Sequence, residues 1–222
     1  MIIRGYGIEL IRLKEADIEL VRANRNSPAI RSTMEFREYI TAAMQKEWFL
    51  SVDNIYNHYY LIVSKGVKCG LINGSKIDWD KGVTASGGIF IWDESALDEF
   101  TAVSASILLT RTSTLMGLHS TYAKILKTNT PAINYNKSLG YELLAGEENN
   151  FNQSYILTQN NFEKRTERIR NFLDKIHGGT IEIIADDPEH PVTKFLLDRI
   201  YKASPEVLKD YKIFDPNNGF VQ

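Results

Sequence analysis

The sequence has a single cysteine and no long apolar run. Cys69 is the only cysteine among 222 residues, so no disulfide can form within the chain, and a reducing, intracellular setting is expected. No stretch reaches the roughly 18 apolar residues that a membrane-spanning helix needs. The N-terminus lacks an apolar segment followed by a small-residue cleavage site. We therefore predict a cytoplasmic protein that does not enter a membrane.

The chain also lacks an excess of positive charge. Its net charge is −2 and its pI is about 6.1, so no basic field is available for nonspecific binding of nucleic acid. The histidines are not spaced as ligands of one metal ion. We expect neither a nucleic-acid partner nor a bound metal.

Apolar periodicity predicts a chain of mixed helices and strands. The strands expected between residues 59 and 92 are joined by turns too short for crossovers, so they form an antiparallel meander. The element order indicates an α+β fold built on one long mixed sheet. Strands are expected at 7–13, 59–64, 67–77, 83–92, 120–127, 141–144 and 154–158, and helices at 15–26, 41–52, 96–116 and 131–139.

Beyond residue 160 the pattern begins again, which predicts two regions, 1–160 and 161–222. In the second, Asn161 precedes an amphipathic helix that ends at Gly178. About 60 residues rarely hold a self-sufficient core. We therefore expect an α/β C-terminal extension that packs on the first region or on a second subunit, as in a homodimer. The extension should contain a strand at 180–185, helices at 191–202 and from 204 onward, and an irregular tail from 213.

Three segments carry a resemblance to a known family. They are RANRNSPAIRSTM at 22–34, YITAAMQKEWF at 39–49 and NTPAINYNKSLGYEL at 129–143. In order and spacing they resemble the GNAT family of N-acyltransferases, above all the members that acetylate protein N-termini or amino sugars. The resemblance covers about residues 7–158. It implies a GNAT-like, mixed and mostly antiparallel sheet flanked by helices.

The resemblance implies transfer of an acetyl or other acyl group from acyl-CoA to a primary amine. The amine would belong to a small molecule, an amino sugar or a peptide. Such a reaction needs a proton acceptor for the amine, donors for the oxyanion, and backbone N–H groups for the CoA pyrophosphate. By the same resemblance, acetyl-CoA would contact Asn129 and the strand backbone of Ile89, Phe90, Ile91 and Trp92.

The expected catalytic positions depart from the family pattern. The family tyrosine that protonates the leaving thiolate falls at Asn136 here, and Tyr135 is its neighbour. One residue along a helix rotates a side chain by about 100°, so Tyr135 can take this role only if the helix register shifts. The acid that the subgroup often carries in its central strand is replaced by Ser86. Our catalytic candidates are therefore Tyr135, Asn136 and Ser86.

The segment after Trp92 contains no glycine, although the family's pyrophosphate motif needs glycines there. The motif positions fall near Ala96, Glu99 and Thr101, and none matches. Ser95 and Asp98 are spaced like a capping box, which would let the following helix cap itself. These features favour an alternative function, a GNAT-fold binding module that does not use acetyl-CoA. The carboxylates that would repel a phosphate are Asp93, Glu94, Asp98 and Glu99.

Overall fold

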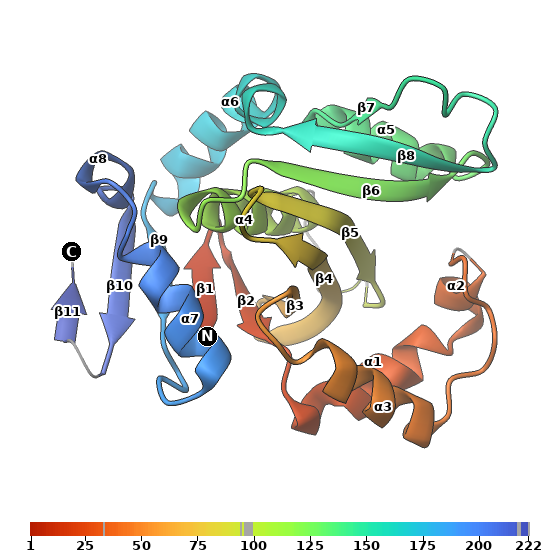
Figure 1. The fold of residues 1–222 in the computed structure, drawn as a ribbon, viewed down its shortest axis with the longest axis horizontal. Coiled ribbons are helices and arrows are strands. Elements are labelled where there is room, and N and C mark those ends of the chain that lie inside the picture. The colour runs from red at the N-terminus through yellow and green to blue at the C-terminus, as the bar shows by residue number, and fades with distance from the viewer. Residues whose placement is uncertain (33, 94, 96–99, 217–218, 222) are drawn as a thin grey trace.

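A computed structural model describes residues 1–32, 34–93, 95, 100–216 and 219–221. One mixed sheet runs through the molecule (Figure 1). Its strands are β1 (Ile2–Gly5), β2 (Ile8–Arg12), β3 (Asn57–Ser64), β4 (Val67–Asp78), β5 (Val83–Ile91), β6 (Ser120–Leu126), β7 (Glu142–Leu143), β8 (Asn152–Thr158), β9 (Ile181–Ile184), β10 (Tyr211–Asp215) and β11 (Gly219–Val221).

The order of the strands across the sheet is β11-β10-β9-β1-β2-β3-β4-β5-β6-β8-β7. Among the described pairs, β5 with β6 and β9 with β10 are parallel, and the others are antiparallel. The meander predicted for residues 59–92 is confirmed as β3, β4 and β5. The predicted α+β class with a mostly antiparallel sheet is therefore confirmed.

Helices cover both faces of this sheet. On one face α4 packs against β1 and β2 and, with apolar residues of β3, β4 and the C-terminal region, builds the larger core cluster. On the other face α1 and α3 pack over Leu61 and Leu71. No helix of the described chain is long and apolar enough to span a membrane. The helices are η1 (Glu15–Asp17), α1 (Ile18–Arg25), α2 (Pro28–Arg31), α3 (Ala42–Val52), α4 (Thr101–Leu115), α5 (Thr130–Leu139), α6 (Gln159–His177), α7 (Pro191–Ile200) and α8 (Pro205–Leu208).

Helix α3 begins where the sequence predicts. The Thr41 hydroxyl accepts a hydrogen bond from the Met44 backbone N–H at 3.2 Å, which caps the helix. Met44 is 40% exposed, whereas Gln45 and Phe49 are buried. Phe49 packs on the sheet, and the helix is rotated so that a glutamine shares its buried face.

The two ends of the chain hold strands that the sequence analysis missed. The N-terminal residues form β1, which places β2 inside the sheet and not at its edge. The tail predicted to be irregular instead forms β10 and β11, and Ile213 is fully buried. Helix α6 also starts earlier than expected, because Thr158 and not Asn161 provides the cap. Short strands of four or five residues carry too little periodicity to be recognised alone.

The region after residue 160 continues the same sheet. Strand β9 pairs antiparallel with β1, and Ile183 lies opposite Ile3. The side chain of Arg111 in α4 forms an ion pair with Asp210, with Nη2 3.0 Å from Oδ2. The Tyr211 hydroxyl donates a hydrogen bond to the backbone carbonyl of Arg111 at 3.1 Å. One hydrophobic core therefore includes side chains from both sides of residue 160. The division of the chain into the two regions 1–160 and 161–222 stays a prediction.

Candidate functional site

A large cavity opens where β5 and β6 separate. These parallel strands pair only at Val83–Ser120 and Thr84–Thr121, at the start of each strand. Beyond that point they diverge, and α5 follows β6 on the far side (Figure 1). The space between them belongs to a cavity of about 1030 Å³. Gly87 lines the cavity, and an added Cβ there would lie 3.0 Å from Thr121 Cγ2.

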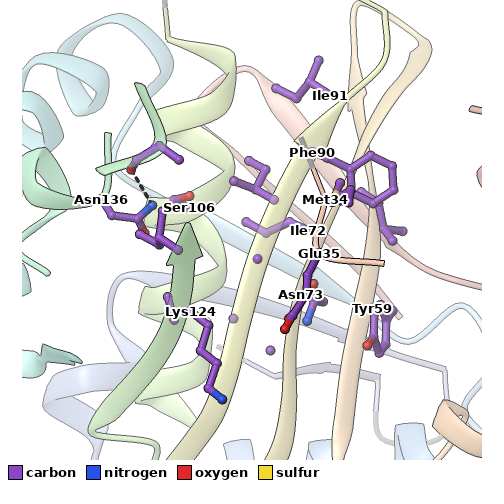
Figure 2. A pocket seen from close by; sticks show the side chains of 18 of the residues that line it. Met34, Glu35, Tyr59, Ile72, Asn73, Phe90, Ile91, Ser106, Lys124 and Asn136 are labelled. Carbon is purple, nitrogen blue, oxygen red and sulfur yellow. Dashed lines mark hydrogen bonds between the residues drawn. The ribbon is translucent and has the colours of Figure 1, made fainter. Parts of the chain in front are cut away.

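Both apolar and polar side chains line the cavity. Ile72 and Ile91 are among the apolar residues that line it, while Asn73, Lys124 and Asn136 are among the polar ones. Figure 2 shows Lys124 and Asn136 on the β6–α5 side, across from Asn73 and Glu35. The segment between α2 and α3 contributes part of the lining as Met34, Glu35 and Phe36.

Tyr135 lines the cavity and connects α5 to α4. Its hydroxyl lies 2.7 Å from Ser106 Oγ and donates to the Ala102 carbonyl at 2.8 Å. Burial raises the pKa of Tyr135 to about 12. The phenol therefore stays protonated near neutral pH and can supply a proton but cannot serve as a base.

The other two catalytic candidates differ in position. Asn136 lines the cavity, with its Nδ2 donating to the Ala132 carbonyl one turn earlier at 2.8 Å (Figure 2). Ser86 is not among the residues that line the cavity. It lies opposite Ser75 of β4, and its carbonyl accepts a hydrogen bond from the Ser75 hydroxyl at 3.4 Å. The structure thus brings Tyr135 and Asn136 together and leaves Ser86 apart.

Most of the residues expected to contact a cofactor line the cavity. Ile89, Phe90 and Ile91 do so along β5, and Asn129 does so at the start of α5. Asn129 Oδ1 accepts from the Ala132 backbone N–H at 3.2 Å, which caps α5. Trp92 is outside the lining. Its indole N–H donates to the Lys68 carbonyl at 2.9 Å, so Trp92 fixes the end of β5 to β4.

Much of the acidic segment after Trp92 lies outside the described residues. This applies to Glu94 and to residues 96–99, and so to the predictions made for Ala96, Asp98 and Glu99. Asp93 Oδ1 accepts a hydrogen bond from the Ser95 backbone N–H at 3.0 Å. The described part of α4 begins at Thr101, and Phe100 at its cap position provides no side-chain cap.

Two polar side chains that sequence reasoning missed also line the cavity. Arg25 at the end of α1 donates through Nη2 to the Phe36 carbonyl at 2.9 Å. Gln45 in the first turns of α3 is only 4% exposed. The signal for Gln45 is weak, because a glutamine one turn before Phe49 is ordinary for a solvent-facing position. Nothing in the sequence separates Arg25 from the other arginines around it.

Comparison with solved structures identifies the fold, whereas no protein-family model and no curated protein matches the chain. An apo structure of FdhC, a nucleotide-linked sugar GNAT, is 16% identical over 78% of this chain and 98% of its own, with a TM-score of 0.64. Spermidine N-acetyltransferase from Vibrio cholerae, in complex with CoA and spermine, is 17% identical over 70% and 98%, with a TM-score of 0.57. The ribosomal L7/L12 alpha-N-protein acetyltransferase RimL, in complex with CoA, is 16% identical over 71% and 98%, with a TM-score of 0.58.

These likenesses define the class of fold. The chain has the fold of the GNAT acetyltransferases, and nearly the whole length of each of these three neighbours is matched. At such low identity the likeness concerns the fold alone. Chemistry has to be argued from the cavity between β5 and β6.

Proposed function

We propose that this protein transfers an acyl group from acyl-CoA to a primary amine. The observation that carries the proposal is the cavity at the divergence of β5 and β6 in a GNAT fold. No backbone pairing of β5 with β6 is described beyond Thr84, which leaves backbone groups on that side of β5 available to a ligand. Two of the structural neighbours were solved with CoA, which supports the same type of ligand here.

The cavity residues suit the extended arm of CoA, whose thioester supplies the activated acyl group when it is bound. The backbone of Ile89, Phe90 and Ile91 would hold the amide groups of that arm. Asn129 would add a side-chain contact, since its Oδ1 caps α5 while no described residue accepts from its Nδ2. Such backbone pairing selects for an extended amide chain because it repeats the hydrogen bonds of a strand.

The acceptor amine must lose a proton before it can attack. An alkyl ammonium has a pKa of about 10.4, so most of it is charged near neutral pH. Glu35 is the only carboxylate among the described residues that line the cavity. We infer that Glu35 attracts the ammonium and takes its proton, directly or through water. Tyr135 would return a proton to the departing thiolate.

Replacing Tyr135 by phenylalanine tests this last role. Tyr135→Phe should lower kcat about 100-fold, the range of a lost general acid, and change KM for acetyl-CoA less than about twofold. Because the Tyr135 pKa is raised to about 12, the wild-type rate should not fall through loss of this proton until the pH approaches that value. The matched control is Tyr56→Phe, an exposed tyrosine outside the cavity. An unchanged kcat in the folded variant would leave Tyr135 only the task of joining α5 to α4.

Acyl-CoA binding tests the proposed function as a whole. Calorimetric titration with acetyl-CoA should give saturable binding, and the melting temperature should rise with ligand concentration. Desulfo-CoA, which keeps the arm and the phosphates, should bind but yield no transfer to a panel of amines. Neither heat nor a thermal shift at millimolar acetyl-CoA would refute the proposal.

A binding module without acyl transfer is the second candidate. Residues 94–103 contain no glycine, and four carboxylates lie between 93 and 99. A field of that sign disfavours a pyrophosphate beside the start of α4. This alternative predicts that acetyl-CoA does not bind, and acetylation of any amine that is lost in an Asn129→Leu variant would reject it.

A further inference from the structure

Two side-chain nitrogens on the α1–α3 side of the cavity are buried and have no hydrogen-bond partner in the described part of the chain. They are Nη1 of Arg25 and Nε2 of Gln45. Both side chains line the cavity. Buried donors are nearly always paired in folded proteins, and each exception calls for an explanation. A ligand in the cavity would provide the missing acceptor after a small rotation of the last side-chain bonds.

Arg25 is the charged member of this pair and decides which kind of acceptor fits. Its Nη2 is bound to the Phe36 carbonyl, and no described carboxylate lies within ion-pair distance of its guanidinium. Burial lowers the pKa of Arg25, as expected for a cation withdrawn from water without a counter-ion. A buried unpaired charge is much less favourable than a buried unpaired amide. The site therefore favours an anionic ligand group over a neutral carbonyl.

We propose that the amine acceptor carries an anionic oxygen group, a carboxylate or a phosphate, which binds to Arg25 and Gln45. This inference rests on the proposed acyl transfer and specifies its substrate. A guanidinium offers two parallel N–H donors that match either anion, and the Gln45 amide adds a third donor. Glu35 then faces the ammonium of the same molecule, so one substrate presents opposite charges to opposite partners.

This arrangement disfavours polycations. A polyamine such as the spermine seen in one structural neighbour would bring positive charge toward Arg25, whose guanidinium has a buried and unpaired Nη1. Like charges in a poorly solvated site repel strongly. We expect the protein to discriminate against spermidine, although its fold is shared with spermidine acetyltransferases.

Matched pairs of amines test the substrate class. The rate of acetyl transfer from acetyl-CoA is measured for γ-aminobutyrate against butylamine, for glucosamine phosphate against glucosamine, and for spermidine. The anionic member of at least one pair should have a kcat/KM about tenfold or more above its uncharged match, the effect of one charge-assisted hydrogen bond. The pair with the larger ratio shows whether the anion is a carboxylate or a phosphate.

Variants of Arg25 locate the effect. Arg25→Met should lower kcat/KM for the preferred anionic amine about 10- to 100-fold and leave its uncharged match within about twofold. Arg25→Lys keeps the positive charge but lacks the paired N–H donors of the guanidinium. It should therefore lose less kcat/KM for the anionic amine than Arg25→Met does. The control is Arg37→Met, because Arg37 also donates to a backbone carbonyl, that of Met34 at 3.0 Å, but does not line the cavity.

The outcomes separate this inference from the proposed function. Transfer to spermidine or to the uncharged amines at equal or higher kcat/KM would overturn the anion site and leave acyl transfer standing. The same conclusion follows if Arg25→Met and Arg25→Lys affect both members of a pair equally. Transfer to no amine would overturn the proposed function. Calorimetric binding of glucosamine phosphate or γ-aminobutyrate that disappears in Arg25→Met would then still support the anion site, and its absence would reject it.

Discussion

A chain that ends at residue 160 is expected to be insoluble. The truncation removes β9, which pairs with β1, and exposes the side of the sheet that α7 covers. Leu173, Ile181, Ile183, Leu196 and Ile200 are fully buried. Each large apolar side chain of this kind contributes about 1.5–3 kcal/mol through burial, so their joint loss is comparable to the whole stability of a typical domain, about 5–15 kcal/mol. The exposed edge of β1 would also invite intermolecular pairing.

Soluble yield, circular dichroism and sedimentation measure this outcome. A chain that ends at residue 216 is the matched control, because it loses only the edge strand β11 and should remain folded. A single substitution gives a graded version: Leu196→Ala should cost about 2–5 kcal/mol in urea unfolding, while Leu50→Ala, at a position 63% exposed, should cost less than about 0.5 kcal/mol. A soluble, folded and monomeric 160-residue chain would show that the first region is self-sufficient.

Replacing Gly87 by valine is expected to abolish acyl-CoA binding. A Cβ at this position would already lie 3.0 Å from Thr121 Cγ2, and the two further methyl groups of valine would add bulk at a position that lines the cavity. The β5 edge that we propose to pair with the CoA arm would then be blocked near its start. We expect kcat/KM for acetyl-CoA to fall more than about 100-fold, which corresponds to about 2.7 kcal/mol.

Ala85→Val controls for the substitution in Gly87. Ala85 lies two residues earlier on β5, is exposed and does not line the cavity. The Ala85→Val variant should bind acetyl-CoA with the wild-type affinity. The added Cβ would lie only 3.0 Å from Thr121 Cγ2, so Gly87→Val should lower the melting temperature by a few degrees, and circular dichroism should show that the variant is folded before its binding is measured. Unchanged acetyl-CoA affinity in this variant would place the ligand elsewhere in the molecule.

Long strands and helices that end at clear turn or capping residues were predictable from the sequence. The meander of β3, β4 and β5 was correct because each strand is long and ends in a short polar turn. Helix α5 was correct because Gly140 adopts a φ of +104°, a conformation that favours glycine at a helix end. The short strands β1, β10 and β11 were missed because three to five residues show too little alternation of apolar and polar side chains. Ile213 of β10 pairs with Ile183 of β9, a long-range contact that a local pattern cannot reveal.

The candidate site was predictable only in part. The resemblance assigned catalytic roles to Tyr135 and Asn136 and cofactor contacts to Asn129 and the β5 residues 89–91, and the structure shows that all of them line the cavity. Ser86 was chosen because it stands where the family subgroup often carries an acidic residue, and it does not line the cavity. Arg25 and Gln45 could not be found, because their significance depends on burial without a partner, which is a property of three-dimensional packing.

The pairing of β1 with β9 has a consequence for the order in which the protein folds. Ile2 lies opposite Ile184, so β1 stays without this partner until a strand far later in the sequence has been synthesised. Contacts between residues so distant in sequence slow folding, and an unpaired strand is prone to aggregation until they form. The nascent chain should therefore depend on chaperones until residue 184 has emerged, and refolding of the finished chain should have a slow phase that substitutions at Ile183 alter.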